Sequence, residues 1–375
     1  MSDRPPKTPR AAHRRASSNL APVKTPATLA EVARLAGFST ATVSRAFNFP
    51  DKVKPEVRQR ILDVAKLVRY RPNRLVSGVL HGRVPILGVV LNVLNTAFMP
   101  ELLGGVFEAC ETAGYSCMVY DSAARQEREV NALKLCIQHR LSGIILFPVD
   151  NESLERSQIL TEIGELDVPV VTLMSPIAAL PEAPLVGNDD YKGALAAVGH
   201  LIELGHRRIL HLSGSDAHYR SSDERLRGYR DAYTRAGLAV PRDLVRIAGF
   251  GPGMQTWRIL EELEFKGKTR PYTAIFAASD YVANRAIQFF QSRGIQVPQQ
   301  VSIVGFGDLP LCELTWPPLT SVNQDFHRVG VMAAQVCLDR VKRKPTNEAS
   351  PWLVPVSLIV RESTGPIARI RKRPS

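Results

Sequence analysis

The sequence predicts a small all-α helix-turn-helix domain joined by a hinge to a larger α/β domain with parallel sheets. Residues 28–48, TLAEVARLAGFSTATVSRAFN, have the spacing of two short helices connected by a tight turn. The net positive charge of the chain is confined to its first 84 residues. Beyond them, apolar runs of strand length alternate with helical stretches, which is typical of a parallel α/β architecture.

The start and end of each short helix can be read from residues that cap helices. Thr28 and Glu31 have the spacing of a capping box, and Gly37 can close the first helix in a left-handed conformation. Ser39 is placed to cap a second helix that begins at Thr40. The apolar positions at helical spacing in the first helix are Leu29, Val32, Ala33 and Ala36.

The second helix has a small, polar outer face. If Val43, Ala46 and Phe47 face the core, the side chains turned outward are those of Thr40, Ala41, Ser44 and Arg45. Small side chains allow close approach to a DNA groove, and arginine suits guanine or phosphate. On pattern alone, an ordinary pair of amphipathic helices remains an alternative.

Charge favours DNA. Residues 1–84 hold 17 Lys and Arg against 5 Asp and Glu, a surplus of 12 that equals the net charge of the whole chain. The remaining residues hold 31 of each sign and are neutral. A basic head on a neutral body is the electrostatic signature of a nucleic-acid partner.

The rest of the head and both ends of the chain complete the predicted layout. Pro55 is expected to open a third helix whose inner face is Val57, Ile61, Val64 and Val68, with the domain closing near Tyr70. We expect residues 1–26 to form a flexible basic arm, 27–73 the helix-turn-helix domain, 74–84 the hinge and 367–375 a basic tail. The hinge is either a plain linker or a segment that becomes helical on DNA, and its own residues favour the linker.

Several function classes are disfavoured. The apolar runs are far shorter than the roughly 20 residues of a membrane span, and the N-terminal residues lack the apolar core of a secretory signal, so we expect a cytoplasmic protein. Five cysteines without paired metal-ligand spacing are read as buried thiols, and no metal or cofactor is expected. No G-x-S-x-G elbow or G-x-G-x-x-G loop is present, so we do not expect an enzyme.

The body is predicted from its apolar runs. Helices are expected at Met99–Ala113 and Tyr191–Leu204. Strands are expected at Ile86–Val90, Ser116–Tyr120, Gly143–Phe147, Pro169–Leu173, Arg208–Leu212, Ala274–Ala277 and Ser302–Phe306.

The order of these pieces resembles the LacI/GalR family of bacterial transcription regulators from Thr28 to about Pro366. The motifs that carry the resemblance are LAEVARLAGFSTATVSRAFN, RYRPN, ILGVV, GYSCMVYDS, LSGIILFP, HLIELGHRRI, ERLRGY, TAIFAASD, VPQQVSIVGFGDLPL, PPLTSVNQD and LIVRESTGP. The resemblance implies a repressor of a carbohydrate or sugar-acid catabolic operon. It also implies a homodimer or tetramer that binds a near-palindromic double-stranded DNA operator.

The same resemblance implies the residues that contact DNA. Thr40 and Ala41 match positions that choose the operator sequence, and Val79 matches the hinge leucine that enters the minor groove. Leu80 is the alternative wedge, because Gly78 costs about 1 kcal/mol in a helix relative to Ala. The expected DNA-binding residues are Thr28, Thr40, Ala41, Thr42, Ser44, Arg45, Asn48, Tyr70, Asn73, Val79 and Leu80.

For residues 85–366 the resemblance implies a two-lobed, periplasmic-binding-protein-like fold with a small-molecule effector, a sugar or sugar acid, between the lobes. The N-lobe is expected at 85–187 plus 319–348, and the C-lobe at 188–318 plus 349–363. The expected effector-binding residues are Asn95, Phe98, Arg225, Phe250, Asp280 and Asp308. The chain departs from the family pattern at Met174-Ser175, Ser279 and Gly307, so no specific sugar is implied.

Overall fold

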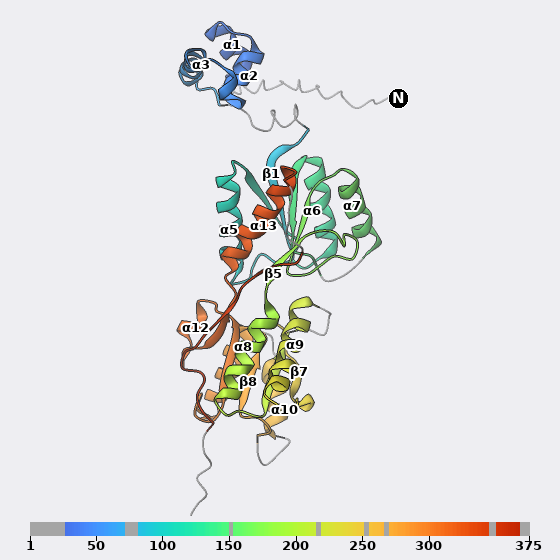
Figure 1. Ribbon diagram of the computed structural model, residues 1–375, viewed down its shortest axis with the longest axis vertical. Coiled ribbons are helices and arrows are strands. Elements are labelled where there is room, and N and C mark those ends of the chain that lie inside the picture. Colours follow the sequence, from blue (N-terminus) through green and yellow to red (C-terminus); the bar gives the residue numbers. More distant parts are fainter. Residues whose placement is uncertain are drawn as a thin grey trace, which may run out of the picture. The chain divides into compact units, whose positions relative to one another are not determined.

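A computed structural model describes residues 27–71, 82–149, 153–214, 219–250, 255–265, 270–344 and 350–367 (Figure 1). By residue contacts the chain divides into two compact units, residues 1–74 and 75–375. No helix within the described residues is long and apolar enough to cross a membrane.

The first unit is a three-helix domain, as predicted. Its helices are α1 (Leu29–Ala36), α2 (Thr40–Asn48) and α3 (Pro55–Leu67), with a short 3₁₀ turn, η1 (Pro50–Lys52), that the sequence analysis did not anticipate. Thr28 and Ser39 cap α1 and α2 through their side chains, and Gly37 ends α1 with a left-handed φ of 77°. These three predictions are confirmed.

The core of this domain differs slightly from the predicted one. Ile61 of α3 is fully buried, but Val57, Val64 and Val68 are only partly buried against the core. Ala65 supplies the second buried position of α3, because a small side chain lets this helix approach α1 and α2 closely. The buried set is Val32, Ala33, Ala36, Val43, Ala46, Ile61 and Ala65.

The second unit contains two six-stranded sheets, which confirms the predicted two-lobed α/β fold. The N-lobe sheet has the order β11-β5-β4-β3-β1-β2 and is entirely parallel. The C-lobe sheet has the order β12-β10-β9-β8-β6-β7, and only β12 runs antiparallel. In both lobes helices cover the two faces of the sheet (Figure 1).

The bounds of the N-lobe elements are as follows. Its strands are β1 (Val84–Leu91), β2 (Ser116–Asp121), β3 (Leu141–Leu146), β4 (Val170–Leu173), β5 (Leu185–Asn188) and β11 (Trp352–Val354). Its helices are α5 (Met99–Thr112), α6 (Gln126–Gln138), α7 (Leu154–Glu165) and α13 (Phe326–Val341). Helices α5 and α13 pack on each other over one face, and α6 and α7 cover the other.

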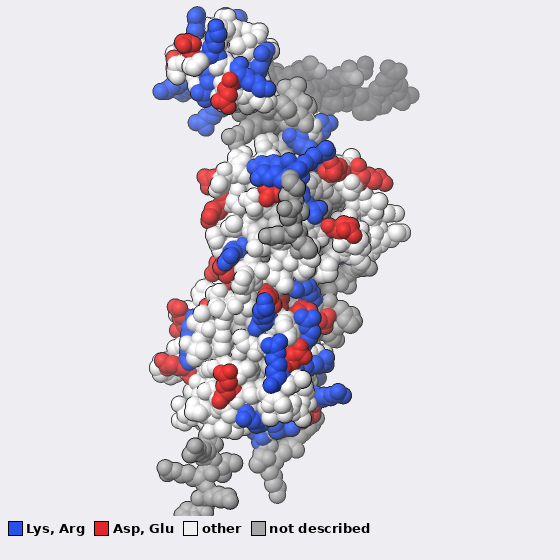
Figure 2. Space-filling view, in the orientation of Figure 1, with Lys and Arg blue, Asp and Glu red and all other residues white. Residues whose placement is uncertain are grey.

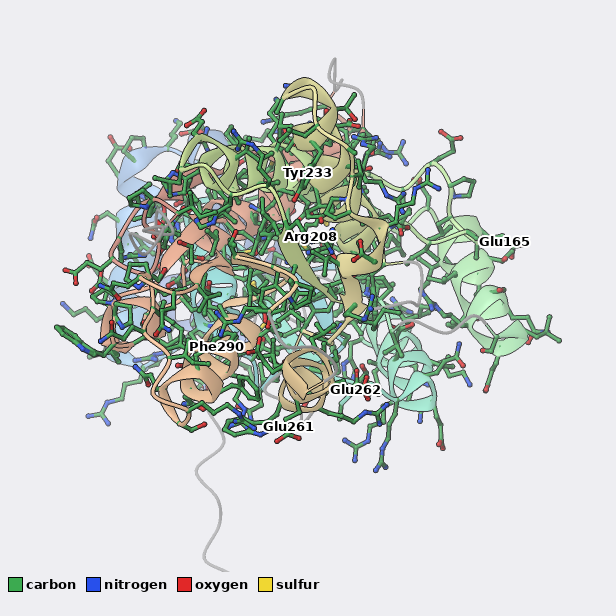
Figure 3. All side chains as sticks on the ribbon, turned by 90° about the horizontal axis from the view of Figure 1, so that it is seen from below. Glu165, Arg208, Tyr233, Glu261, Glu262 and Phe290 are labelled. Carbon is green, nitrogen blue, oxygen red and sulfur yellow. The ribbon has the colours of Figure 1, made fainter. Side chains whose placement is uncertain are left out.

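The C-lobe is built in the same way. Its strands are β6 (Ile209–Ser213), β7 (Val245–Ile247), β8 (Ala274–Ala277), β9 (Ser302–Gly307), β10 (Thr320–Asn323) and β12 (Ser357–Ile359). Its helices are α8 (Asp190–Glu203), α9 (Arg220–Arg235), α10 (Gln255–Phe265), α11 (Asp280–Gln291) and α12 (Leu311–Leu314), with a 3₁₀ turn η2 (Arg242–Leu244). Tyr233 and Phe290 belong to the cores on the two faces of this sheet (Figure 3).

The chain passes between the lobes three times, and two of the predicted lobe boundaries need correction. Residues 319–323 were expected in the N-lobe, yet β10 pairs with β9, with Thr320 opposite Val304, so the chain returns to the N-lobe only at α13. Residues 349–354 were expected in the C-lobe, yet β11 pairs with β5, with Trp352 opposite Val186. Each of these strands belongs to the lobe that contains its hydrogen-bonded partner strand, and the partner strand is distant in sequence.

A neutral histidine is buried in the C-lobe. His211 of β6 is fully buried, its ring stacks against the rings of Phe276 and Tyr229, and its Nδ1 lies 3.1 Å from the Phe276 carbonyl oxygen. Its Nε2 has no hydrogen-bond partner among the described residues. Burial lowers the pKa of His211 to about 4, so the ring is uncharged at neutral pH.

This burial predicts a pH dependence of stability. In the unfolded chain His211 titrates near its ordinary pKa of 6.5, so between pH 4 and 6.5 the unfolded state binds more protons and stability rises with pH. The contribution is about 3 kcal/mol across that window. His211→Phe keeps an aromatic ring and removes the titration, so urea unfolding at several pH values should show a flatter acid limb in the variant. Equal pH slopes in the two proteins would contradict the assignment.

Candidate DNA interface and effector site

The outer face of α2 is the candidate DNA interface. Thr40, Ala41 and Arg45 are exposed, and Val43 and Ala46 beneath them are fully buried. Thr42 and Ser44 are half-buried, and the Thr42 hydroxyl lies 2.9 Å from the hydroxyl of Ser39. The predicted orientation of α2, with Val43 and Ala46 inward and Thr40, Ala41 and Arg45 outward, is therefore confirmed.

The remaining predicted DNA residues fall into two groups. Thr28 is exposed but its hydroxyl accepts the Glu31 N–H at 3.2 Å, and Tyr70 is half-buried with its ring 5.6 Å from that of Phe47. Both therefore help to shape the domain. Asn73, Val79 and Leu80, the side chain of Asn48, and the arm and tail lie outside the described residues.

Positive charge surrounds this helix. Figure 2 shows Lys and Arg spread over the visible face of the first unit, with few acidic side chains between them. The exposed cations among its described residues are Arg34, Arg45, Lys52, Lys54, Arg58, Arg60, Lys66, Arg69 and Arg71. Such a surface attracts a phosphate backbone whatever its base sequence.

In the second unit, the candidate effector residues of the N-lobe come from the loop after β1. Phe98 is half-buried, with its ring stacked 4.5 Å from that of Phe326 and 6.5 Å from that of Phe147. Asn95 is exposed, while the hydroxyl of the neighbouring Thr96 is buried without a hydrogen-bond partner among the described residues. The N-lobe thus presents aromatic rings near the carboxyl ends of its strands.

Arg225 of α9 is held by groups of the protein itself. Its Nε and Nη2 donate to one oxygen of Asp190 at 2.9 and 2.8 Å, and its Nη1 donates to the Ala278 carbonyl. Its Nη2 also lies 3.5 Å from Oε1 of Gln324, and the guanidinium stacks 3.8 Å above the ring of Phe306. Four of the five N–H groups are therefore engaged, and the residue is 6% exposed.

The guanidinium of Arg225, which the family resemblance implies to be an effector contact, is therefore not free. Asp190 is buried beside it, and Arg220 lies 3.8 Å from the second carboxylate oxygen. Burial raises the pKa of Asp190, and the two guanidinium groups oppose that rise. A ligand can use Arg225 only by replacing one of these internal contacts.

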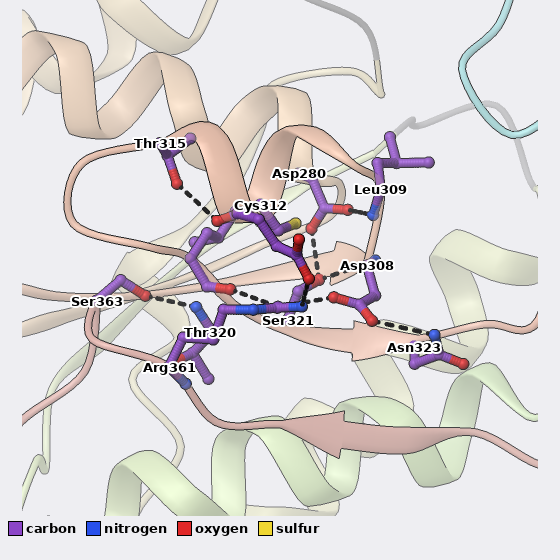
Figure 4. A network of polar contacts seen from close by, with 12 residues as sticks. Asp280, Asp308, Leu309, Cys312, Thr315, Thr320, Ser321, Asn323, Arg361 and Ser363 are labelled. Atoms are coloured by element: carbon purple, nitrogen blue, oxygen red, sulfur yellow. Dashed lines mark hydrogen bonds and ion pairs between the residues drawn. The ribbon is translucent and has the colours of Figure 1, made fainter.

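Asp280 is not placed as a ligand-binding carboxylate. It is fully buried as the first residue of α11, where Oδ2 accepts the Leu309 N–H at 2.9 Å and Oδ1 accepts the Ser321 hydroxyl at 2.5 Å (Figure 4). Burial raises its pKa, and these hydrogen bonds oppose the rise. The prediction that Asp280 accepts effector hydroxyls needs correction, because protein donors occupy both oxygens.

A glycine explains how that carboxylate fits. Gly307 ends β9 with a φ of 135°, and a Cβ there would lie 2.8 Å from Oδ2 of Asp280. Gly307, one of the positions where the chain departs from the family pattern, therefore has no room for a side chain. Asp280 instead ties α11 to the turn after β9.

Asp308 is also internally paired. Its Oδ1 lies 2.7 Å from Nη1 of Arg361, and its Oδ2 accepts the Asn323 amide N–H at 3.0 Å (Figure 4). Arg361 follows β12 and also donates to the Leu319 carbonyl at 2.9 Å. The Asp308 carboxylate thus joins three segments of the C-lobe, and 11% of the Asp308 side chain is exposed.

Phe250 is the predicted effector residue that contacts Arg225, and it is more exposed than Arg225 itself. The residue is half-buried, and its ring centroid lies 5.5 Å from the guanidinium carbon of Arg225 and 6.2 Å from the ring of Tyr219. It lies directly over Gly214, where any Cβ would approach the Phe250 ring to 2.2 Å. Arg225 and Phe250 are therefore brought together, as a sugar-stacking site needs.

Sequence reasoning missed the residues that connect these groups. Gln324 is 4% exposed, its Nε2 donates to Oδ1 of Asn188 at 3.2 Å, and the Asn188 amide donates back to the Gln324 carbonyl. Asn188 ends β5 and Gln324 follows β10, so this amide pair joins two of the three segments that pass between the lobes. Asp190 and Gln324 are visible as polar residues at strand ends, but no local pattern marks them as partners of Arg225.

Known proteins and family models resemble both units of the chain. The model for bacterial regulatory proteins of the lacI family matches residues 28–73, and that for a periplasmic binding protein-like domain matches residues 198–364. Catabolite control protein A of Priestia megaterium is 31% identical over 341 residues, which cover 90% of this chain and 99% of that protein. The chain belongs to the LacI family of bacterial regulatory proteins. It is accordingly a DNA-binding transcriptional regulator and not an enzyme.

Solved structures show the same assignment. The transcriptional regulator CelR in complex with cellobiose has 30% sequence identity and a TM-score of 0.65, covering 90% of this chain and 99% of that one. The Lac repressor dimer bound to operator and the anti-inducer ONPF has 25% identity and a TM-score of 0.75, covering 91% and 99%.

The interface on α2 predicts distinct effects for two substitutions. Arg45→Ala should cost about 1 to 3 kcal/mol of DNA affinity, because an exposed guanidinium contact is lost without change to the core. Ala41→Gln should change the preferred base sequence and leave binding intact. Selection from a randomised site library measures both, and an unchanged preferred sequence for Ala41→Gln would show that α2 is not the recognition helix.

The burial of Asp280 predicts a loss of stability on substitution. Asp280→Ala leaves the Leu309 N–H and the Ser321 hydroxyl buried without their acceptor, at about 1 to 3 kcal/mol for each. Asp280→Asn keeps one acceptor oxygen and should lose less. Thermal unfolding of both variants measures these losses. If Asp280→Ala were as stable as wild type and no longer responded to a ligand, Asp280 would again be assigned to ligand binding.

Proposed function

We propose that the chain is a homodimeric repressor of a carbohydrate or sugar-acid catabolic operon, acting in the cytoplasm on a near-palindromic operator. A small molecule bound between the lobes changes its affinity for that operator. One helix-turn-helix covers only a half-site, so a two-fold symmetric dimer matches a near-palindrome. The complexes of CelR with cellobiose and of the Lac repressor with operator support both halves of the proposal.

The observation that carries the proposal is the pairing of Arg225 with Phe250 at the carboxyl ends of the C-lobe strands. Parallel α/β sheets bind ligands at this edge. We assign the effector contacts to Phe98, Arg225 and Phe250, with Asn95 and Asp308 at the margin of the site. Asp280 is withdrawn from this set because its carboxylate is enclosed.

The switch follows from the internal contacts of Arg225. Its contact with Gln324 is the longest of its hydrogen bonds, at 3.5 Å, and Gln324 belongs to a segment that passes between the lobes. A ligand that takes over this contact binds one lobe geometry better than the other, which is the condition for shifting a two-state equilibrium.

The proposal predicts that sensing and DNA binding can be separated. Phe250→Ala should bind operator as wild type does and lose its response to the effector, because it removes a stacking surface and leaves the first unit unchanged. Titration of operator DNA with and without sugars, sugar acids and nucleobases measures this, after thermal shift has identified a stabilising compound.

The matched control is Phe107→Ala, which removes an exposed phenylalanine of α5 and should respond like wild type. An unchanged response in Phe250→Ala would place the sensing site elsewhere. A wild-type protein that binds operator and responds to no compound would favour a partner protein as the signal.

A further inference from the structure

One end of the N-lobe carries a surplus of positive charge that the effector site does not use. Six cations gather there: Arg83, Arg140, Arg340, Lys342, Arg343 and Lys344. All are exposed except the half-buried Arg83. Figure 2 shows Lys and Arg gathered over the region where α13 ends and β1 begins. We call these six residues the basic end.

Contacts place these residues together, although they come from different parts of the chain. Arg83 donates to the Leu166 carbonyl at 2.5 Å, and the next residue, Asp167, pairs with Arg343 at 2.8 Å. The Arg140 carbonyl accepts the Val84 N–H at 2.9 Å. The basic end therefore lies at the amino ends of β1, β3 and β4, opposite the strand ends that hold the effector residues.

The charge exceeds what local structure needs. Cations at the C-terminus of α13 favour the helix dipole, but Arg83 and Arg140 belong to other elements. The acids that pair with these cations or line the hollow beside them are Asp167, Glu182 and Asp339, three against the six cations. Since residues 85–375 are neutral as a whole, this surplus is a local feature of one end.

The shape of the surface indicates an extended polyanion and not a small anion. Arg340, Arg343 and Lys344 line a hollow of about 640 Å³, but Asp167 and Glu182 line it too. A small anion in that hollow would meet both signs of charge. A phosphate backbone can instead pass along the exposed cations, of which Arg343 is 84% exposed.

A short segment of the chain connects the DNA-binding unit to the basic end. Arg71 is the last described residue of the DNA-binding unit, and β1 of the N-lobe begins at Val84, beside Arg83. The chain from residue 71 to residue 82 spans at most about 40 Å when fully extended. Arg83 is thus the member of the basic end that follows the DNA-binding unit most closely along the chain.

We propose that the basic end binds the phosphate backbone of the duplex flanking the operator. It adds affinity without reading sequence, because exposed Lys and Arg contact phosphates and not base edges. The DNA footprint of the regulator is then longer than the half-sites read by the two recognition helices.

A charge-neutral triple variant tests this surface. Arg140→Gln, Arg340→Gln and Lys342→Gln together remove three exposed cations and leave the ion pairs Arg343–Asp167 and Lys344–Asp339 in place. The matched control is Arg230→Gln, Arg242→Gln and Arg258→Gln, which removes three exposed arginines of the C-lobe. Both variants have the same net charge, so a difference between them reports location.

The measurement is the affinity for a selected operator, as a function of salt, in a minimal duplex and in one with long flanks on both sides. The basic-end variant should lose affinity only on the flanked duplex, by threefold or more, and its salt slope there should become shallower by at least 1. The control triple should match wild type on both. The proposal would be overturned if the two triple variants had the same affinity for the flanked duplex. It would also be overturned if the basic-end variant lost the same affinity on both duplexes.

Discussion

The two lobes depend on the buried polar contacts between the segments that pass from one sheet to the other. Asn188 and Gln324 exchange hydrogen bonds while 0% and 4% exposed, and Asp189 donates its N–H to the carbonyl of Val354 at 3.1 Å. All three passages of the chain are thereby tied together. A buried amide left without a partner costs about 1 to 3 kcal/mol, so these contacts favour a few discrete lobe geometries over a continuous range.

The proposed effector residue Arg225 contacts the same segments that pass between the lobes. Arg225 reaches Gln324 from α9, and Asp190, its strongest partner, is the first residue of α8, just after β5 ends. The proposed effector residue therefore touches both the first and the second passage between the lobes. A ligand that exchanges for an internal partner of Arg225 acts on the relative position of the lobes with no need for a longer pathway.

Local patterns in the sequence predicted what depends on local physics. The caps at Thr28, Gly37 and Ser39 and the outward face of α2 follow from side chains within a few residues of each other, and the structure has them. Apolar runs located seven of the strands, namely β1, β2, β3, β4, β6, β8 and β9. The short strands β5, β7, β10, β11 and β12 were not predicted, because the position of each is decided by backbone pairing across the fold.

The candidate site shows the same limit. Arg225 and Phe250 were predicted and are adjacent. Asp280 was predicted as a ligand residue from the family resemblance, but glycine at 305 and 307 gives its carboxylate room against β9, where it meets protein donors. The partnership of Arg225 with Asp190 joins residues 35 positions apart, and neither its existence nor its effect on ligand access follows from spacing.

The most direct test of this account is a double-mutant cycle between Asn188 and Gln324. The unfolding free energy is measured for wild type, Asn188→Ala, Gln324→Ala and the double variant. Asn188→Ala leaves the side-chain N–H and the backbone carbonyl of Gln324 without their partner, and Gln324→Ala leaves Oδ1 of Asn188 without its donor. If the pair joins the passages between the lobes, the interaction energy is about 1 kcal/mol or more. Losses that add within about 0.5 kcal/mol would contradict the central role given to this contact.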